Sequence, residues 1–324
     1  MMPLQFALIG CGFIGRRHLE NIAARSDVLL AATVDVREKA ARALCHEFKG
    51  RYYSKQPEQV FEDRSIDAVL ICTHHDSHTQ LALSAAAHGK HILLEKPMAL
   101  SVEESRQIAT AASQAGITLT VNFKFRFAPA VLKVKELIRS PLAIHGQLAM
   151  ERMPDEIWVR DPVRGGGLIL ATACHSLDMI CWLADSQPVR VYAEGVPHLP
   201  EQGCNLTAVS ATVRFANRAV ASLLLAEAGE NSYAGKWLHE VFGGNCSAVL
   251  YDHFRQARFS GVTLLHYAAE NELHADGTFG VLEDFVHSIR TGKKPVITAA
   301  DGTRATELAH AILKSVRNGQ PEEL

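Results

Sequence analysis

The sequence predicts an α/β domain with a doubly wound parallel sheet, followed by an α+β domain with a largely antiparallel sheet. Over the first 122 residues, short apolar runs alternate with helix-compatible segments, and a glycine-rich turn joins the first run to the first helix. Later, apolar and polar residues alternate with period two. We therefore expect domains at 1–122 and 123–324, and the C-terminal helix at 303–318 is a candidate to pack back on the first.

Composition excludes several classes of protein. At 324 residues, with 48% hydrophobic and 21% charged residues, the chain is long enough for two globular cores. A net charge of −2 gives no long-range attraction to nucleic acid or an anionic membrane, and no apolar run approaches the ~20 residues of a membrane span. The seven cysteines are scattered without a Cys-x-x-Cys spacing, which predicts reduced thiols in a cytoplasmic protein.

The first turn has the pattern of a dinucleotide-binding loop. The apolar run Gln5 to Ile9 ends at Gly10-Cys11-Gly12-Phe13-Ile14-Gly15, and a helix-compatible segment, Arg16 to Ala24, follows. In such a loop the first glycine makes the turn, the second admits a pyrophosphate and the third lets the helix pack on the strand. The pattern alone is weak, but its place between a strand and a helix strengthens it.

The second strand ends in a residue that bears on the choice of cofactor. The apolar run Val28 to Val34 ends at Asp35, 20 residues after Gly15, which is the spacing of a carboxylate that binds the adenosine ribose hydroxyls. Such a carboxylate repels a 2′-phosphate, so the sequence favours NAD over NADP. Arg37 lies two residues later and is able to pair with that phosphate, which leaves NADP open as an alternative.

Alternation continues through the first half. Further strands are expected at Ile66 to Cys72, Lys90 to Leu94 and Ile117 to Val121. The motif Ser101-Val102-Glu103-Glu104 is a capping box, so a helix should begin there. Connected strands of this kind form a parallel sheet with helices on both faces.

A histidine-rich loop follows the strand at 66–72. The run Thr73-His74-His75-Asp76-Ser77-His78 suggests metal binding, but no fourth ligand has a suitable spacing. We therefore expect no metal. Because the loop lies at the carboxyl end of a parallel strand, we expect it to line the cofactor, with Thr73, His75 and His78 in contact.

The strand at 90–94 ends in the tripeptide Glu95-Lys96-Pro97. A lysine at a strand end is usually a solvated surface charge. Open parallel sheets, however, bind ligands at the carboxyl ends of their strands. The glycine loop and Asp35 therefore favour Lys96, with Glu95, as part of a cofactor site.

The second half has a different pattern. A helix is expected at Pro129 to Ile138, and a hairpin joins Ala208 to Phe215 with Ala219 to Leu225. Further strand candidates are Leu238 to Phe242, Ser247 to Tyr251 and Gly261 to His266. These strands indicate a largely antiparallel sheet.

Between the two patterns lies a segment rich in candidate site residues. It contains Trp158, Arg160, the triad Gly165-Gly166-Gly167 and the run His175-Ser176-Leu177-Asp178. Three consecutive glycines permit close approach of the backbone to a ligand or to another segment. A lone helical histidine is more often structural than catalytic, and the arginines are equally compatible with solvated charges.

Together these pieces resemble the Gfo/Idh/MocA family of oxidoreductases across essentially the full length. The elements that match are Gly10 to Gly15, Asp35, Thr73 to His78, Glu95-Lys96-Pro97, Gly165-Gly166-Gly167 and His175 to Asp178. The resemblance implies a Rossmann domain joined to an open-faced sheet domain, through which members often oligomerise, so we expect a homodimer or homotetramer. It also implies hydride transfer between a nicotinamide cofactor and a sugar, polyol or related hydroxy compound.

The resemblance makes Lys96 the acid/base group and His175 its partner near the reacting hydroxyl. Arg126, Trp158 and Arg160 are further candidates for the substrate pocket, together with His175. The cofactor contacts that we expect are Gly10, Gly12, Phe13, Ile14, Gly15, Asp35, Arg37, Thr73, His75, His78, Glu95 and Lys96.

One departure from the family pattern affects the predicted chemistry. Family members frequently have Asp four residues before the His, and here that position is Ala171, with Ala173 where a Gly is common. The sequence leaves open whether this change alters or abolishes activity. Two alternatives to a polyol dehydrogenase follow: a nicotinamide-binding sensor without turnover, and an NADP-linked reductase of a sugar carbonyl or imine.

Overall fold

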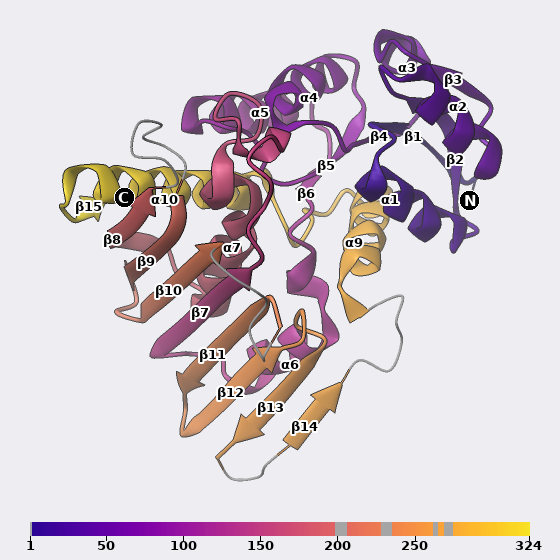
Figure 1. Ribbon diagram of the computed structural model, residues 1–324. Helices are drawn as coiled ribbons and strands as arrows, with labels where there is room; N and C mark the ends of the chain where they lie inside the picture. Colours follow the sequence, from indigo (N-terminus) through magenta and orange to yellow (C-terminus); the bar gives the residue numbers. More distant parts are fainter. Residues whose placement is uncertain (1, 198–205, 228–234, 262–264, 269–274) are drawn as a thin grey trace. The chain divides into compact units, whose positions relative to one another are not determined.

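The computed structural model describes residues 2–197, 206–227, 235–261, 265–268 and 275–324 (Figure 1). The chain divides into two compact units. The first contains Met1–Asn122 and Thr278–Thr303, and the second contains Phe123–Gly277 and Arg304–Leu324. Residues 278–303 thus belong to the first unit, although the division at residue 122 expected from the sequence does not include them.

The first unit is built on a six-stranded sheet with the order β3-β2-β1-β4-β5-β6. All its paired strands are parallel, and this order is that of a doubly wound sheet, as predicted. The strands are β1 (Leu4–Ile9), β2 (Val28–Val34), β3 (Tyr52–Ser54), β4 (Ala68–Ile71), β5 (His91–Leu94) and β6 (Leu119–Val121). Strand β4 is buried along its whole length, because helices cover both faces of such a sheet.

The helices of the first unit begin and end at recognisable residues. They are α1 (Phe13–Ala23), α2 (Glu38–Glu47), α3 (Glu58–Glu62), α4 (His78–Ala87), α5 (Val102–Gln114) and α9 (Thr278–Thr291). The predicted capping box is present: Ser101 Oγ accepts from the Glu104 amide at 3.2 Å, and Glu104 Oε2 accepts from the Ser101 amide at 3.1 Å. Helix α9 returns to the sheet, where the Phe285 ring packs edge-on against Phe6 at 5.8 Å.

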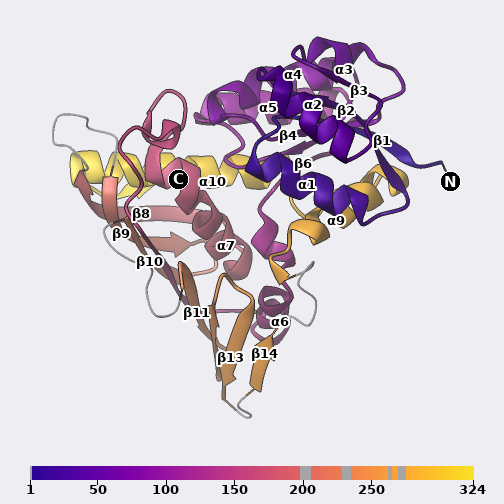
Figure 2. The ribbon, with the colours of Figure 1, turned by 45° about the vertical axis from the view of Figure 1, so that its right-hand side comes forward.

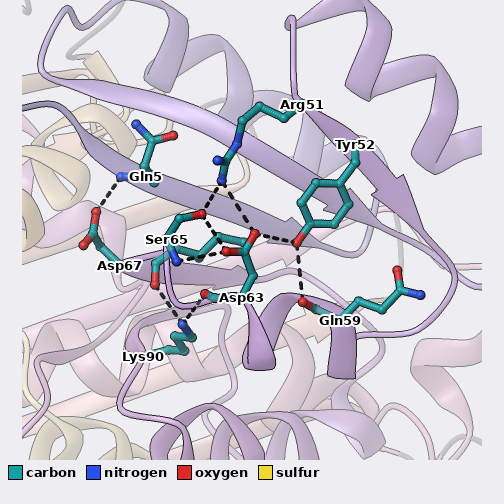
Figure 3. A network of polar contacts seen from close by, with 9 residues as sticks. Gln5, Arg51, Tyr52, Gln59, Asp63, Ser65, Asp67 and Lys90 are labelled. Carbon is teal, nitrogen blue, oxygen red and sulfur yellow. Dashed lines mark hydrogen bonds and ion pairs between the residues drawn. The ribbon is translucent and has the colours of Figure 1, made fainter.

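A polar network closes the amino-terminal edge of this sheet (Figure 3). Lys90, which is 5% exposed, donates from Nζ to the carbonyls of Asp63 at 2.7 Å and Ile66 at 2.9 Å. Asp67 Oδ2 accepts from the Gln5 amide at 2.7 Å. Lys90 therefore precedes β5 instead of starting it, and it fixes the turn that leads into β4.

The second unit contains a nine-stranded sheet with the order β14-β13-β12-β11-β7-β10-β9-β8-β15. Only β7 and β10 pair in parallel among the described strands, so the sheet is mixed but largely antiparallel. The strands are β7 (Ala143–Met150), β8 (Pro188–Pro197), β9 (Leu206–Phe215), β10 (Val220–Glu227), β11 (Trp237–Gly243), β12 (Cys246–Tyr251), β13 (Gln256–Ser260), β14 (Leu265–Ala268) and β15 (Glu322–Glu323).

The predicted hairpin is present, since β9 and β10 pair antiparallel. The strand expected at 261–266 falls partly on residues 262–264, which lie outside the described residues. Of the rest, Gly261 is in a bend after β13, and β14 begins at Leu265.

One face of the nine-stranded sheet is covered. Helices α6 (Pro129–Leu137) and α7 (Cys174–Ala184) lie along the same side of it (Figure 2). Strands β9 and β10 alternate as the period-two pattern predicts, with Val213 and Leu223 buried. The opposite face exposes side chains that include Tyr192, Leu224 and Phe242.

Helix α10 (Ala299–Asn318) has contacts in both units. Near its start, Gly302 lies against Met98, which a side chain at that position would meet at 2.6 Å. Near its end, Ser315 Oγ accepts from the Ala193 amide of β8 at 2.9 Å. No helix within the described ranges is long and apolar enough to span a membrane.

Candidate functional site

The glycine loop between β1 and α1 contains two glycines required by packing and one that is not. Gly10 has φ +98°, and a Cβ there would lie 2.3 Å from the Cys72 carbonyl oxygen. A Cβ on Gly15 would lie 2.2 Å from the Gly10 carbonyl oxygen. A Cβ on Gly12 would meet nothing within 4 Å. Packing thus explains Gly10 and Gly15, whereas Gly12 leaves space through which a ligand can approach the backbone.

The start of α1 fits a dinucleotide for two reasons. Gly12 caps the helix without a side-chain hydrogen bond, so the first amides of α1 have no side-chain cap to compete with a phosphate. Phe13 is 84% exposed and Ile14 is 42% exposed. Exposed apolar side chains at this position are suited to cover an aromatic or apolar part of a ligand.

Asp35 follows β2 and holds the loop and Arg37 together. Its Oδ2 accepts from the Cys11 amide at 2.8 Å, and its Oδ1 accepts from the Arg37 amide at 2.8 Å and from Arg37 Nε at 3.1 Å. Burial raises the pKa of Asp35, but the hydrogen bonds from Arg37 and Cys11 outweigh it and lower the pKa below its usual value. Asp35 is therefore ionised at neutral pH, with the Arg37 side chain, 67% exposed, beside it.

The loop after β4 contains a half-buried threonine and two buried histidines. Thr73 is half-buried and its Oγ1 accepts from Ser77 at 2.6 Å. His75 is buried in the short helix η1 (His75–Ser77), with its ring 5.5 Å from that of His78. His78 is 0% exposed and donates from Nδ1 to the Pro97 carbonyl at 2.8 Å.

That hydrogen bond makes His78 a support for the turn after Lys96. Burial lowers the pKa of His78, so the ring is neutral at physiological pH. Across the described ranges, no three or more His, Cys, Asp or Glu side chains form a group that could hold a metal ion.

Glu95, which directly follows β5, lies in a buried polar network. Its Oε1 accepts from His18 Nε2 at 2.9 Å and from Asn122 Nδ2 at 2.6 Å. Burial raises the pKa of Glu95, but the hydrogen bond and charge of His18, with the Lys96 ammonium, outweigh it and lower the pKa to about 2. Glu95 is therefore a buried carboxylate with satisfied acceptors.

Lys96 is half-buried and follows Glu95 at the carboxyl end of β5. Its amide donates to Glu95 Oε2 at 3.2 Å. The sequence analysis found Glu95 and Lys96 but missed His18 and Asn122. Asn122 directly follows β6, the neighbour of β5, so the predicted strand order was a signal for it.

In the second unit, His175 stands on an aromatic cluster. The ring is 7% exposed, and it lies 4.9 Å from the Phe125 ring, 5.8 Å from Trp237 and 6.2 Å from Phe123. These contacts fix the orientation of the imidazole. The sequence analysis missed Phe125 and Trp237, which are far from His175 in the chain.

A π-helical turn, η4 (Ile169–Ala173), leads directly into α7 and His175. It contains Ala171, the position at which family members frequently have Asp. Ala171 is 3% exposed, and its neighbour Leu170 is buried as well. The site has a buried methyl group there instead of a carboxylate.

Arg126 forms a buried ion pair. Its Nε donates to Asp178 Oδ2 at 2.8 Å, its Nη2 donates to Asp178 Oδ1 at 2.5 Å, and both side chains are 2% exposed. From the sequence, Arg126 was expected to line a substrate pocket. In the structure Asp178 binds Arg126, so these two residues connect α7 to the turn before α6.

Arg160 is also held by a buried carboxylate. Its Nη2 donates to Glu227 Oε1 at the end of β10, and the same nitrogen donates to the Met153 carbonyl at 3.0 Å. Trp158, half-buried, begins the same turn (η3, Trp158–Arg160). A Cβ on Gly165 would lie 2.3 Å from the Val159 carbonyl oxygen, so Gly165 packs on this turn.

Comparison with known proteins gives two matching family profiles. Residues 4–123 match an oxidoreductase family with an NAD-binding Rossmann fold, and residues 131–249 match the GFO/IDH/MocA C-terminal domain. Together the two profiles extend over most of the chain and over parts of both units.

Individual proteins are similar over nearly the full length. The chain is 26% identical to the myo-inositol 2-dehydrogenase of Thermotoga maritima, over 99% of this chain and 98% of the relative. It is 26% identical to the scyllo-inositol 2-dehydrogenase (NAD(+)) of Bacillus subtilis, over 98% and 95%. In fold it is similar to a levoglucosan dehydrogenase solved with NADH and levoglucosan, with a TM-score of 0.90, 22% identity and 99% of each chain covered.

Proposed function

Since the chain belongs to the Gfo/Idh/MocA family of oxidoreductases with an NAD-binding Rossmann domain, we propose that its substrate is a sugar, inositol or related polyol. The reaction is hydride transfer at a hydroxyl-bearing carbon. The observation that supports this best lies in the first unit: one edge of the parallel sheet brings together the open backbone at Gly12, the ionised Asp35 and the half-buried Lys96. The names of the inositol dehydrogenases, similar over nearly the whole chain, support the substrate class.

In this proposal Lys96 handles the proton of the reacting oxygen. A bound nicotinamide cofactor supplies the hydride acceptor or donor. In oxidation the Lys96 amine removes the hydroxyl proton, and in reduction its ammonium returns a proton to the carbonyl oxygen. The buried Glu95 and the hydrogen bond from His78 to Pro97 hold the backbone on either side of Lys96.

His175 is proposed to hydrogen-bond the reacting oxygen. Support comes from its orientation on the rings of Phe125 and Trp237, which leaves little rotational freedom. With Ala171 in place of the family's Asp, no carboxylate at that position helps His175. Trp158 remains a proposed substrate contact, while Arg126 and Arg160 act through Asp178 and Glu227 on the shape of the second unit.

Asp35 and Arg37 are proposed to set the cofactor preference, with NAD bound more tightly than NADP. Ionised Asp35 accepts the ribose hydroxyls and repels a 2′-phosphate. Arg37 reduces that repulsion because it is paired with Asp35, so NADP is the weaker but still usable cofactor.

The exposed face of the nine-stranded sheet is proposed as the surface of a homodimer or homotetramer. Tyr192, Leu224 and Phe242 are large side chains exposed on it, at 39%, 41% and 42%. Light scattering of the purified protein tests this, and a monomer at micromolar concentration would contradict it. We also propose a cytoplasmic location, supported by the described cysteines, which form no disulfides.

The decisive experiment is a substrate panel. Inositols, aldoses, anhydro sugars and small alcohols are each supplied with NAD and followed at the nicotinamide absorbance, then the corresponding ketones with NADH and NADPH. Turnover with a polyol supports the proposal. Turnover only in the reductive direction with NADPH would favour a sugar carbonyl or imine reductase, for which Arg37 is the supporting residue. Tight NADH binding without turnover on any compound would indicate a sensor.

A further inference from the structure

The carboxylate of Glu95, the residue before Lys96, accepts three hydrogen bonds. Glu95 Oε1 accepts from His18 at 2.9 Å and from Asn122 at 2.6 Å, while Oε2 accepts from the Lys96 amide at 3.2 Å. His18 belongs to α1, the helix that starts at the glycine loop, and Asn122 follows β6. Three separate elements therefore meet at one carboxylate, and that carboxylate holds the residue after it.

Pro97 and His78 hold the backbone on the carboxyl-terminal side of Lys96. The carbonyl of Pro97 accepts from His78 Nδ1 at 2.8 Å, and His78 is fully buried at the start of α4. The backbone of Lys96 is thus held from both neighbours, by α1 and β6 through Glu95 and by α4 through Pro97. A side chain that starts from a fixed backbone reaches a limited set of positions.

The charges around Glu95 point to an electrostatic role as well. Within the first unit, the titratable groups that face Glu95 are His18 from α1, Cys72 after β4, His78 from α4 and Lys96 itself. Of these, Lys96 is the group that belongs to the proposed chemistry, and its charge is one of the causes that lower the pKa of Glu95. A buried carboxylate next to an ammonium stabilises the protonated amine.

We propose that Glu95, oriented by His18 and Asn122, is a positioning residue that aims Lys96 and stabilises its protonated form. This rests on the proposed acid/base role of Lys96. The carboxylate does not touch the substrate: it acts through the lysine that follows it. Its connection to α1 also links the placement of Lys96 to the helix that starts at the glycine loop.

A simpler explanation is that the network only stabilises the fold. Buried ion pairs and hydrogen bonds often do no more than that, and their loss lowers stability. A purely structural network, when weakened, lowers the amount of folded enzyme but leaves the pH dependence of kcat per folded molecule unchanged. The pH profile is therefore the measurement that separates the two explanations.

The test compares Glu95→Gln with the unmodified protein, using the substrate found in the panel. Gln keeps the shape and one acceptor but removes the charge. The plateau of kcat for oxidation at high pH should fall ~10-fold, because the lysine is less well aimed. The acidic limb of the profile should move toward lower pH by about one unit, because the neutral amine is no longer disfavoured by a facing carboxylate. The Kd for NADH should change less than ~3-fold.

Two further variants separate the positioning of Lys96 from the effect of the Glu95 charge on it. His18→Leu removes one donor and keeps the carboxylate, so the plateau should fall while the acidic limb stays in place. In a Lys96→Met background, Glu95→Gln should cost nothing further, because the two residues act through one another. Asp67→Asn is the matched control, since it removes a hydrogen-bonded carboxylate from the opposite edge of the same sheet and should leave the profile unchanged.

The outcomes distinguish this inference from the proposed function. If Lys96→Met retains turnover, the acid/base role of Lys96 is wrong. If Lys96→Met loses turnover but folded Glu95→Gln keeps both the plateau and the limb, only the positioning role is wrong. Should Glu95→Gln fail to fold, His18→Leu decides: an unchanged kcat per folded molecule would overturn the inference, and a lowered plateau with an unmoved limb would support it.

Discussion

Two lysines flank strand β5, and they differ in which of their atoms the protein holds by hydrogen bonds. At the amino-terminal end, Lys90 is 5% exposed and its ammonium donates to the carbonyls of Asp63 and Ile66 (Figure 3). At the carboxyl-terminal end, Lys96 is half-buried, and hydrogen bonds hold its backbone amide and the backbone carbonyl of Pro97. The Lys90 ammonium thus stabilises a turn. At Lys96, by contrast, the hydrogen bonds hold the backbone from which the side chain extends.

The difference teaches that residue type alone does not distinguish a structural lysine from a chemical one. Burial lowers the pKa of Lys90, yet its donors are directed at backbone carbonyls, where they complete the fold. A perturbed pKa is therefore no evidence of function at this edge of the sheet. The glycine loop and Asp35, at the edge where ligands bind, are what set Lys96 apart.

Lys96→Met should give the largest effect. Turnover should fall ~10²-fold or more, because the group that handles the substrate proton is lost, while NADH affinity stays nearly the same. Steady-state kinetics and fluorescence titration with NADH measure the two quantities. Turnover near that of the unmodified protein would show that Lys96, like Lys90, has no chemical role.

The second-largest effect should be the contribution of Glu95 to the pH dependence of the unfolding free energy. Its pKa is about 2 in the folded protein against an ordinary value of 4.5, so its contribution to the unfolding free energy is complete above pH 4.5 and is lost as pH falls toward 2. The shift corresponds to about 3 kcal/mol of unfolding free energy. Urea unfolding between pH 6 and 3, compared with Glu95→Gln, measures it. Equal slopes against pH in the two proteins would contradict the assignment.

Lys90→Met should lower the unfolding free energy by about 2 kcal/mol, because buried carbonyls lose their donor. Turnover per folded molecule should not change, since the residue lies at the edge away from the glycine loop. Lys39→Met, at an exposed position of α2, is the matched control and should change neither quantity. A loss of turnover in folded Lys90→Met would contradict the conclusion that Lys90 is structural and Lys96 chemical.

Arg37→Ser should give the smallest effect. It removes the cation that partly neutralises Asp35, so NADP affinity should fall ~10-fold while NAD affinity changes little. Isothermal titration with both cofactors provides the measurement. A variant that binds NADP as tightly as before would mean that Arg37 does not contact the 2′-phosphate.

Local patterns predicted most of the fold. The capping box at Ser101 and the alternation in β9 and β10 are properties of neighbouring residues, and both occur as expected. The parallel sheet followed from alternation alone. The return of 278–303 to the first unit did not, because a helix carries no sequence mark of the sheet on which it will pack.

The site was predictable only where motifs are contiguous. The glycine loop, Asp35 and Glu95-Lys96-Pro97 are short runs. His18 and Glu95, by contrast, are 77 positions apart, and Arg160 and Glu227 are 67 apart. Pairs of this kind form only when the chain has folded, so no residue near Arg160 in the sequence indicated that a buried carboxylate would hold it.

The π-helical turn before α7 holds one residue more than an α-helical turn would. Deletion of a single residue within 169–173 would therefore convert the turn to α-helix and leave the residues after it facing as before. A deletion inside α7 removes a residue from a regular α-helix, so everything after it would rotate by about 100°. Deletion at the turn should thus keep His175 against the rings of Phe125 and Trp237, whereas loss of a residue between His175 and Asp178 should turn Asp178 away from Arg126.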